Sequence, residues 1–231
     1  MNAALAALIA ISAALPVRAA GDLKPVSALV ETSVNQVMAI LKDKALDRDS
    51  KKKKVMAVGE ALFDMQLMSK LVLGRENWPK FDAKQQKEFS DLFVKQLQDS
   101  YFEKVDLLTD ETVEFKEPAL QKDGKVVLLT HILSKNERYE MIYKLYKKAE
   151  VWKAYDVEIE GISLVKAYGA QYDEFLRKSA PADLLKKLRE APFERPKDLE
   201  KSKKGSKDAA GAKDAPAPEA GAPAGVPAGK P

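Results

Sequence analysis

The sequence predicts an α+β domain in which helices pack on one face of a small, curved, mainly antiparallel four-stranded sheet and enclose an apolar slot. Three observations predict it. Apolar residues recur every three or four positions in the first half of the chain, which is the helical period. They alternate with polar residues from about 112 to 159, which is the strand period, and the helical period then returns. Helices grouped before and after a block of strands are typical of the α+β class.

Both ends of the 231-residue chain differ in composition from its middle. Residues 2–15 are almost all small or apolar, and the segment Pro16–Ala20 has small residues where a signal peptidase cleaves. We therefore predict a signal peptide at 1–19; the alternative is a buried N-terminal helix. Residues 197–231 are rich in Ala, Pro, Gly and Lys and too poor in large apolar residues to fold, which predicts a disordered tail. The folded domain is expected at 20–196.

Two helices are predicted at the start of the domain. Apolar residues at helical spacing follow Pro25, which suits a first helical turn, and they predict a helix over about 26–41. A second helix is predicted over 51–73 and ends at Gly74, because glycine readily terminates helices.

Asp82 marks the start of a third helix. Gln85 follows three residues later, and this spacing is that of a capping box, in which two side chains satisfy backbone amides reciprocally. Further helices are predicted after the sheet, at about 166–178 and 181–190.

The middle of the domain reads as an antiparallel meander. Strands are predicted at 112–115, 125–133, 139–146 and 151–159. Asp123-Gly124 and Lys135-Asn136 mark short turns, and short turns join antiparallel neighbours. Alternation gives the sheet an apolar and a polar face. The apolar face is expected to carry Tyr139, Met141, Tyr143, Leu145, Tyr155, Val157 and Ile159, and the polar face Asp156, Glu158 and Glu160.

The chain lacks the residue patterns of most catalytic and nucleic-acid-binding proteins. Its net charge is only +4, it has no cysteine, and it contains neither a nucleotide-binding glycine motif nor a hydrolase serine motif. Asp156, Glu158 and Glu160 stand in a row that could hold a metal or act in acid–base chemistry, but a solvated strand face is the simpler interpretation. The single histidine, His131, lies in an apolar run and is expected to be structural. We expect no enzyme activity, no metal, no cofactor and no nucleic-acid partner.

Two long motifs carry a resemblance to a known family. Residues 63–75 read FDMQLMSKLVLGR and are followed by Trp78. Residues 152–165 read WKAYDVEIEGISLV and are followed by Tyr168 and, further on, Tyr172. In this order they resemble the signature segments of the MlaC family, and the resemblance extends from about residue 26 to 188. Ala167 and Gly169 stand where the family often has Asn and Arg.

The resemblance implies a function that composition does not. MlaC proteins are periplasmic carriers, also called toluene-tolerance auxiliary proteins, that shuttle a phospholipid between an outer-membrane lipoprotein complex and an inner-membrane ABC transporter with a lipid-binding ring. The resemblance also implies that the acyl chains insert between the helices and the sheet, with the headgroup exposed. A monomer whose only cargo is a phospholipid is expected.

Candidate lipid-binding residues come from two sources. The two family motifs support Phe63, Leu67, Val157, Ile159, Ile162, Leu164 and Tyr168. Phe93 and Tyr101 are supported because Phe81, Gln85, Phe89, Leu92, Phe93, Leu97 and Tyr101 resemble the next helix of the family. Strand alternation alone supports Leu133, Met141 and Tyr143. For each of these residues, ordinary core packing is the competing interpretation.

Two other functions stay open from sequence. One is a periplasmic protein-binding adaptor with a filled core and no lipid. The other is a hydrolase that depends on Asp156 or His131. We assign Asp156 and Glu160 to structure, as anchors of a loop or helix.

Overall fold

The strands of the computed structural model, which describes residues 22–105, 111–134 and 137–199, form one antiparallel six-stranded sheet. The four predicted strands are present as β1 (Thr112–Phe115), β3 (Val126–Ser134), β4 (Glu137–Lys148) and β5 (Val151–Ile159). Two short strands were not predicted: β2 (Ala119–Leu120) extends the β1 edge, and β6 (Ile162–Ser163) forms the opposite edge. The order β1-β3-β4-β5-β6 is the predicted meander.

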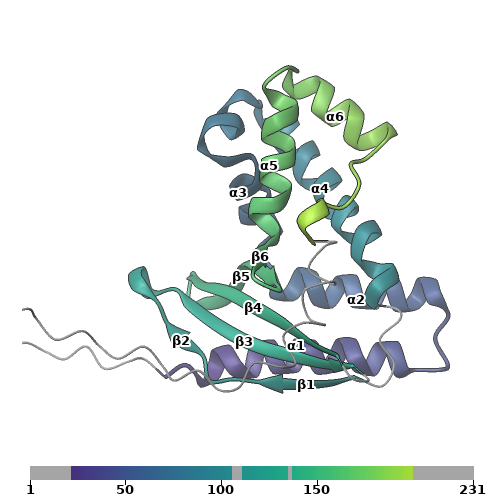
Figure 1. Ribbon diagram of the computed structural model, residues 1–231, viewed down its shortest axis with the longest axis vertical. Coiled ribbons are helices and arrows are strands. Elements are labelled where there is room, and N and C mark those ends of the chain that lie inside the picture. Colours follow the sequence, from purple (N-terminus) through teal and green to yellow (C-terminus); the bar gives the residue numbers. More distant parts are fainter. Residues whose placement is uncertain (1–21, 106–110, 135–136, 200–231) are drawn as a thin grey trace, which may run out of the picture.

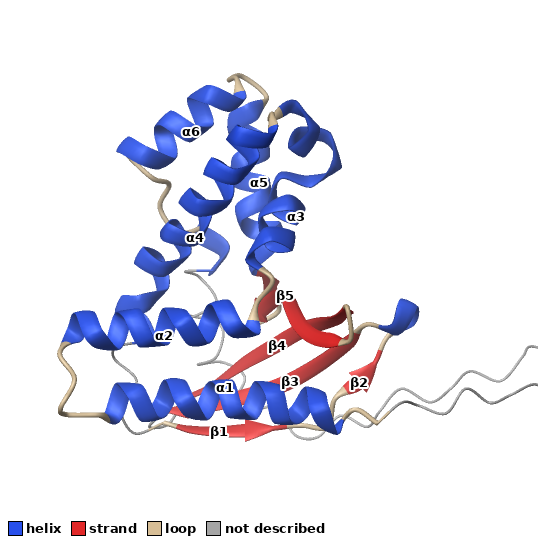
Figure 2. Ribbon diagram, turned by 180° about the vertical axis from the view of Figure 1, so that it is seen from behind, coloured by secondary structure: helices blue, strands red, loops and turns tan. Residues whose placement is uncertain are grey.

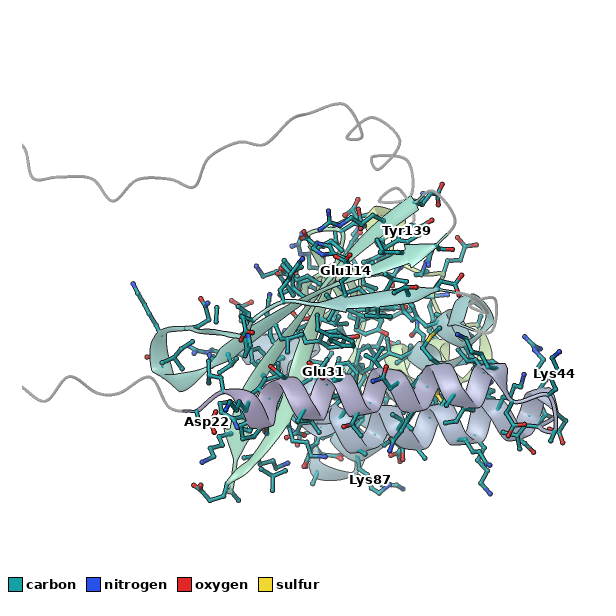
Figure 3. The ribbon with its side chains drawn as sticks, turned by 90° about the horizontal axis from the view of Figure 1, so that it is seen from below. Asp22, Glu31, Lys44, Lys87, Glu114 and Tyr139 are labelled. Carbon is teal, nitrogen blue, oxygen red and sulfur yellow. The ribbon has the colours of Figure 1, made fainter. Side chains whose placement is uncertain are left out.

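The helices lie on one side of the sheet and beyond its β6 edge. They are α1 (Lys24–Lys42), α2 (Arg48–Leu62), α3 (Met65–Asn77), α4 (Ala83–Val105), α5 (Leu164–Leu176) and α6 (Pro181–Glu190), with short 3₁₀ turns at Trp78–Lys80 and Lys122–Gly124. Helices α1 and α2 run side by side across one face of the sheet, while α3 to α6 form a bundle above it (Figures 1 and 2). Viewed from below, α1 and α2 leave the other face of the sheet uncovered (Figure 3). The predicted α+β class is confirmed.

The predicted helix over 51–73 is wrong, because the chain breaks between α2 and α3. Phe63 is extended and forms a parallel bridge with Ala154 of β5, and the Asp64 amide donates to the Ala154 carbonyl at 2.8 Å. The Asp64 side chain then caps α3 by accepting a hydrogen bond from the Leu67 amide at 3.0 Å. A strand edge and a cap therefore replace one turn of helix.

Because of a β-bulge, Tyr155 lies on the face of the sheet opposite to the predicted one. The register of β4 with β5 shifts between Lys144 and Leu145, so that Ala154 lies opposite Leu145 and Tyr155 has no partner. Ala154 is fully buried on the inner face, whereas the Tyr155 ring packs edge-on against Tyr146, 6.0 Å between centroids. The bulge keeps Val157 on the inner face, as predicted.

The residues of β3 that face the helices also differ from the prediction, because the alternation is shifted by one position. Leu128 and Thr130 are fully buried and pair with Tyr143 and Met141 of β4, so the even-numbered positions of β3 face the helices. Leu133 pairs with Arg138 and lies on the opposite, outer face, because successive strand residues alternate. The expectation that Leu133 belongs to the apolar face is therefore wrong.

Aromatic rings from α4 and α5 form the centre of the bundle. Phe89 and Phe93 stack at 6.0 Å, and Tyr168 and Tyr172 meet the Phe93 ring edge-on at 5.7 and 6.2 Å. The Tyr172 hydroxyl donates to the buried Gln96 side chain at 2.7 Å, which satisfies the polar end of the ring.

Helix α5 crosses α3 at Gly169, where the family motif often has Arg. A β-carbon at this glycine would lie 2.9 Å from the carbonyl oxygen of Val72. Only glycine allows the two backbones to approach this closely, so any side chain here would push α5 away from α3.

The capping box predicted at the start of α4 is present. The Gln85 amide donates to the Asp82 carboxylate at 2.8 Å, and the Asp82 amide donates to the Gln85 side chain at 3.1 Å. The predicted signal peptide, the Lys135-Asn136 turn and residues 200–231 of the predicted tail lie outside the described residues. Leu199, assigned to the tail from sequence, is buried in the core at 3% exposure.

Candidate functional site

A cavity of about 290 Å³ lies between the inner face of the sheet and helices α1, α2 and α4. The N-terminal ends of α3 and α5 complete its wall. The lining is Ser33, Val34, Val37, Met38, Val55, Met56, Val58, Gly59, Glu60, Leu62, Phe63, Met65, Met68, Val94, Leu97, Gln98, Tyr101, Val113, Ile132, Met141, Tyr143, Val157, Ile159 and Leu164. Almost all of these side chains are apolar, so the cavity suits an apolar ligand.

Helix α1 contributes a narrow stripe to this wall. Ser33, Val34, Val37 and Met38 share one side of the helix because they are spaced by about one turn. Ser33 is the polar member, but its hydroxyl donates to the Leu29 carbonyl at 2.8 Å. Because the hydroxyl is engaged in that bond, Ser33 presents only its methylene group to the cavity. The stripe is therefore apolar along its whole length.

The sheet supplies the floor of the cavity. Tyr143 of β4 and Val157 of β5 pair directly, and the Phe63 ring lies 6.4 Å from the Tyr143 ring. Burial raises the pKa of Tyr143 to about 12, and its phenol therefore stays neutral at physiological pH. The floor consequently presents no charge to a ligand.

The structure brings together part of the candidate set proposed from sequence. Phe63, Tyr101, Met141, Tyr143, Val157, Ile159 and Leu164 all line the cavity. Leu67, Phe93, Leu133, Ile162 and Tyr168 do not. The motif match and the strand alternation thus each contributed residues inside the cavity and residues outside it.

The residues outside the cavity have other surroundings. Phe93 and Tyr168 are fully buried in the aromatic core of the bundle. Leu67 is partly buried on α3, and Leu133 lies on the outer face of the sheet. Ile162 lines a separate hollow beside the start of α5, together with Gly161 and Lys166.

Sequence reasoning missed most of the wall built by α1 and α2. The signal was present, because these helices carry apolar residues at helical spacing and methionines, which suit adaptable apolar surfaces. Met38 of α1 and Met56 of α2 line the cavity, as do Met65 and Met68 of α3. Periodicity could not distinguish a face that packs against other side chains from one that borders a cavity.

Apart from Ser33 and the Tyr143 phenol, the polar side chains of the lining come from α2 and α4. Glu60 is exposed, and Gln98 and Tyr101 are partly buried. Burial raises the pKa of Tyr101, and the neighbouring Tyr168 raises it further. Among the described residues the Tyr101 hydroxyl oxygen has no hydrogen-bond partner, so a ligand could use it.

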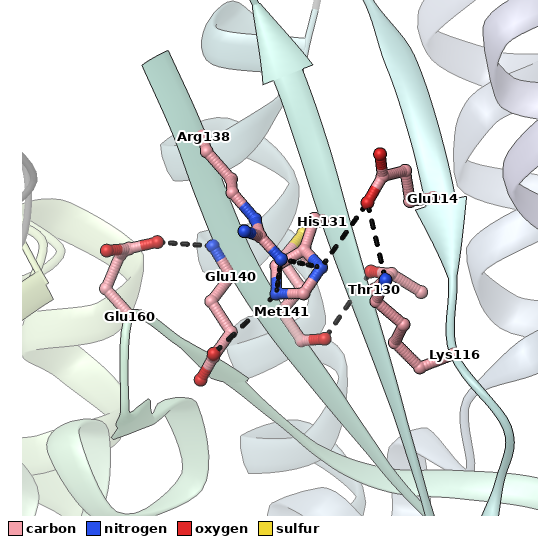
Figure 4. Close-up of polar contacts among 8 residues, drawn as sticks. All are labelled: Glu114, Lys116, Thr130, His131, Arg138, Glu140, Met141 and Glu160. Atoms are coloured by element: carbon pink, nitrogen blue, oxygen red, sulfur yellow. Dashed lines mark hydrogen bonds and ion pairs between the residues drawn. The ribbon is translucent and has the colours of Figure 1, made fainter. Parts of the chain in front are cut away.

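The outer face of the sheet carries a charged cluster around His131, away from the cavity. Glu114 of β1 and Glu140 of β4 flank His131, each 3.9 Å from one of its ring nitrogens, and the Arg138 guanidinium lies 2.8 Å from Nδ1 (Figure 4). Burial lowers the pKa of His131, and the charges of Arg138 and Lys116 lower it further, against the opposing effect of the two glutamates. Within the described ranges, no group of three or more potential ligands is arranged to hold a metal ion.

Asp156, another candidate for chemistry, anchors the start of α5, as predicted. It accepts hydrogen bonds from the Ser163 hydroxyl at 2.6 Å and the Val165 amide at 3.1 Å. Lys144 lies 3.2 Å away on the neighbouring strand and also pairs with Glu158. Glu160 is engaged in the same structural way, since it accepts from the Glu140 amide. All of these acceptors are occupied by the fold.

Comparison with solved structures gives a neighbour with a known ligand. A phospholipid-binding protein from Ralstonia solanacearum, solved in complex with a phospholipid, matches with a TM-score of 0.63 and 26% sequence identity. The match covers 75% of this chain and 97% of that chain. Comparison with curated protein sequences gave no significant match.

In the described part of the chain, no helix combines the length and apolar character that crossing a membrane requires.

Comparison with family models agrees with the motifs that the sequence carries. The model described as MlaC protein matches residues 31–190, from the middle of α1 to the end of α6. The matched range contains every residue that lines the cavity. The chain belongs to the MlaC family.

Proposed function

We propose that this protein is a periplasmic phospholipid carrier that holds the acyl chains of a glycerophospholipid in the cavity between α1, α2, α4 and the sheet. The observation that carries the proposal is the apolar cavity itself, in a chain of the MlaC family whose structural neighbour was solved with a phospholipid. We further propose that it shuttles the lipid between an outer-membrane lipoprotein complex and the lipid-binding ring of an inner-membrane ABC transporter. The carrier acts as a monomer.

The physical requirement of such a carrier is an apolar compartment. Two acyl chains carry roughly 30 methylenes, and each is worth about 0.8 kcal/mol when buried, so the gross cost of exposing both chains to water is on the order of 20 kcal/mol. The cavity volume of about 290 Å³ is at the lower end of the range for small-molecule pockets. We therefore expect the α1–α2 layer to move away from the sheet when two chains enter.

Lipid extraction tests the proposal directly. The full chain, expressed with secretion and purified without detergent, is extracted with organic solvent, and the extract is analysed by mass spectrometry. We expect close to one phospholipid per chain. Repeated absence of phospholipid from such preparations would refute the proposal and favour an adaptor that binds only proteins.

The geometry disfavours the two alternatives raised by the sequence. An adaptor with a filled core does not need a cavity lined by five helices and the sheet. A hydrolase needs its reactive groups at the ligand, but His131 lies on the outer face and Asp156 is engaged by Ser163 and Val165. Lysophospholipid production that disappears in Asp156→Asn would reinstate the hydrolase.

Tyr101→Phe should separate ligand binding from stability. The wild-type hydroxyl is buried without a partner among the described residues, and burying an unsatisfied hydroxyl costs about 1–3 kcal/mol. We expect the variant, measured by urea unfolding without lipid, to be more stable by about 1 kcal/mol. If the hydroxyl donates to a lipid ester or phosphate, phospholipid affinity falls up to about tenfold. Reduced stability with unchanged lipid binding would contradict this role.

A further inference from the structure

Gly59 lies at the centre of the α2 face that borders the cavity. On a helix, residues three and four positions apart share a face. Within α2 these neighbours of Gly59 are Val55, Met56 and Leu62, and all of them line the cavity together with Gly59 itself. A side chain at position 59 would therefore point into the cavity.

The space in front of Gly59 is empty. A β-carbon built at this position meets no heavy atom within 4 Å beyond its own helix backbone and chain neighbours. Gly169 is the contrasting case, because there a β-carbon would collide with the Val72 carbonyl. Neither tight packing nor a positive φ angle requires glycine at position 59.

Glycine is a poor choice for the interior of a helix. It is among the weakest helix formers, and alanine would strengthen α2 at no steric cost. Glycine at position 59 weakens the helix and leaves the adjacent cavity space open. Its presence is explained if the protein needs that open volume for its ligand.

We propose that the missing side chain at position 59 sets how much acyl chain the cavity holds, and that Gly59 thereby determines the preference for long-chain phospholipids. The inference rests on the proposed lipid-binding function and adds a residue that selects among lipids. The selection is steric: a side chain at position 59 occupies volume that acyl methylenes otherwise fill.

The expected effect follows from the methylenes that lose their place. Each methylene left outside the cavity lowers affinity about fourfold. A leucine at position 59 that displaces only two methylenes shifts the preference between a long-chain and a short-chain lipid by roughly 15-fold. An alanine displaces about one methylene and should shift the preference about fourfold.

A competition between two lipids tests the inference. The full-length wild type, Gly59→Leu, Gly59→Ala and the control Ala57→Leu are incubated with vesicles that contain equal amounts of dilauroyl- and dioleoylphosphatidylcholine. The protein is then isolated again, and the bound ratio of the two lipids is measured by mass spectrometry. Ala57 is exposed, lies on α2 and does not line the cavity, so its variant places the same leucine side chain on the same helix but outside the site.

We expect Gly59→Leu to shift the bound ratio towards the dilauroyl lipid by at least tenfold, Gly59→Ala to shift it less, and Ala57→Leu to match the wild type. An unchanged ratio in Gly59→Leu, or an equal loss of both lipids, overturns the inference while leaving the proposed function intact. Thermal unfolding identifies a misfolded leucine variant, and Gly59→Ala then decides alone. A wild type that binds neither lipid refutes the proposed function as well.

Discussion

Phe93→Ala should lower the free energy of unfolding by about 3–5 kcal/mol, because the change removes a whole ring from a closely packed core. Phe93 is 0% exposed and contacts the rings of Phe89, Tyr168 and Tyr172. These rings join α4 to α5, so the cavity left by the missing side chain lies at the centre of the bundle. The rigid rings around it can fill little of the space.

Urea unfolding of lipid-free protein measures this effect, and Leu97→Ala provides a matched control. Leu97 lies one turn further along α4, is only partly buried at the margin of the core and lines the cavity. We expect Leu97→Ala to lose less stability, since its side chain borders space that is already empty, and to alter lipid retention more. If Phe93→Ala leaves stability unchanged and depletes bound lipid, Phe93 belongs to the binding site.

Local patterns predicted most of the secondary structure. The bounds of α6 match the prediction, because its leucines repeat at the helical period and Pro181 fixes its first turn. The strands of the meander were predicted because alternation and turn residues are also local signals. Strand β6, with only two residues, is too short to produce such a pattern.

Features created by distant contacts could not be predicted in this way. The break at Phe63 exists because β5 offers a strand edge that accepts the Asp64 amide, and no pattern within residues 48–77 encodes that partner. The bulge that turns Tyr155 outward likewise depends on its pairing with β4. A strand alternation rule fails by one residue at each such bulge.

The sequence predicted the apolar character of the candidate site but not which apolar residues line it. The motif residues Phe63 and Val157 line the cavity, whereas the motif residue Tyr168 packs in the bundle core. All are large, apolar or aromatic, and a sequence gives no measure of empty volume. Gly59 shows the same limit, since the residue without a side chain leaves no apolar signal to find.

Asp64→Ala should destabilise the protein by about 2–4 kcal/mol, because one buried carboxylate holds three partners. It caps α3 through the Leu67 amide, accepts from the Tyr146 hydroxyl and pairs with Lys148 at 2.7 Å. The side chain is only 4% exposed. Removing it leaves the Leu67 amide without its cap and deletes the side-chain contacts of the α2–α3 link with Tyr146 and Lys148 of β4, while the backbone bond from the Asp64 amide to Ala154 remains.

Asp64→Asn separates the charge of this carboxylate from its capping role. Asparagine caps helices about as well as aspartate but carries no charge towards Lys148. We therefore expect Asp64→Asn to lose about half of the stability that Asp64→Ala loses. Equal losses in the two variants would show that the charge, and not the cap, dominates.

The pH dependence provides an independent check on the charge of Asp64. Burial alone would raise the pKa of Asp64, but the hydrogen bonds from Lys148, Tyr146 and the Leu67 amide outweigh it and hold the pKa below its ordinary value. A depressed pKa in the folded state means that the stabilisation is complete above the unfolded pKa, about 3.9, and is lost as the pH falls through the folded value. The stability difference between wild type and Asp64→Asn should therefore be constant near neutral pH and shrink below about pH 4. A difference that stays constant into more acidic solution would show that the carboxylate is not held in its charged form by these partners.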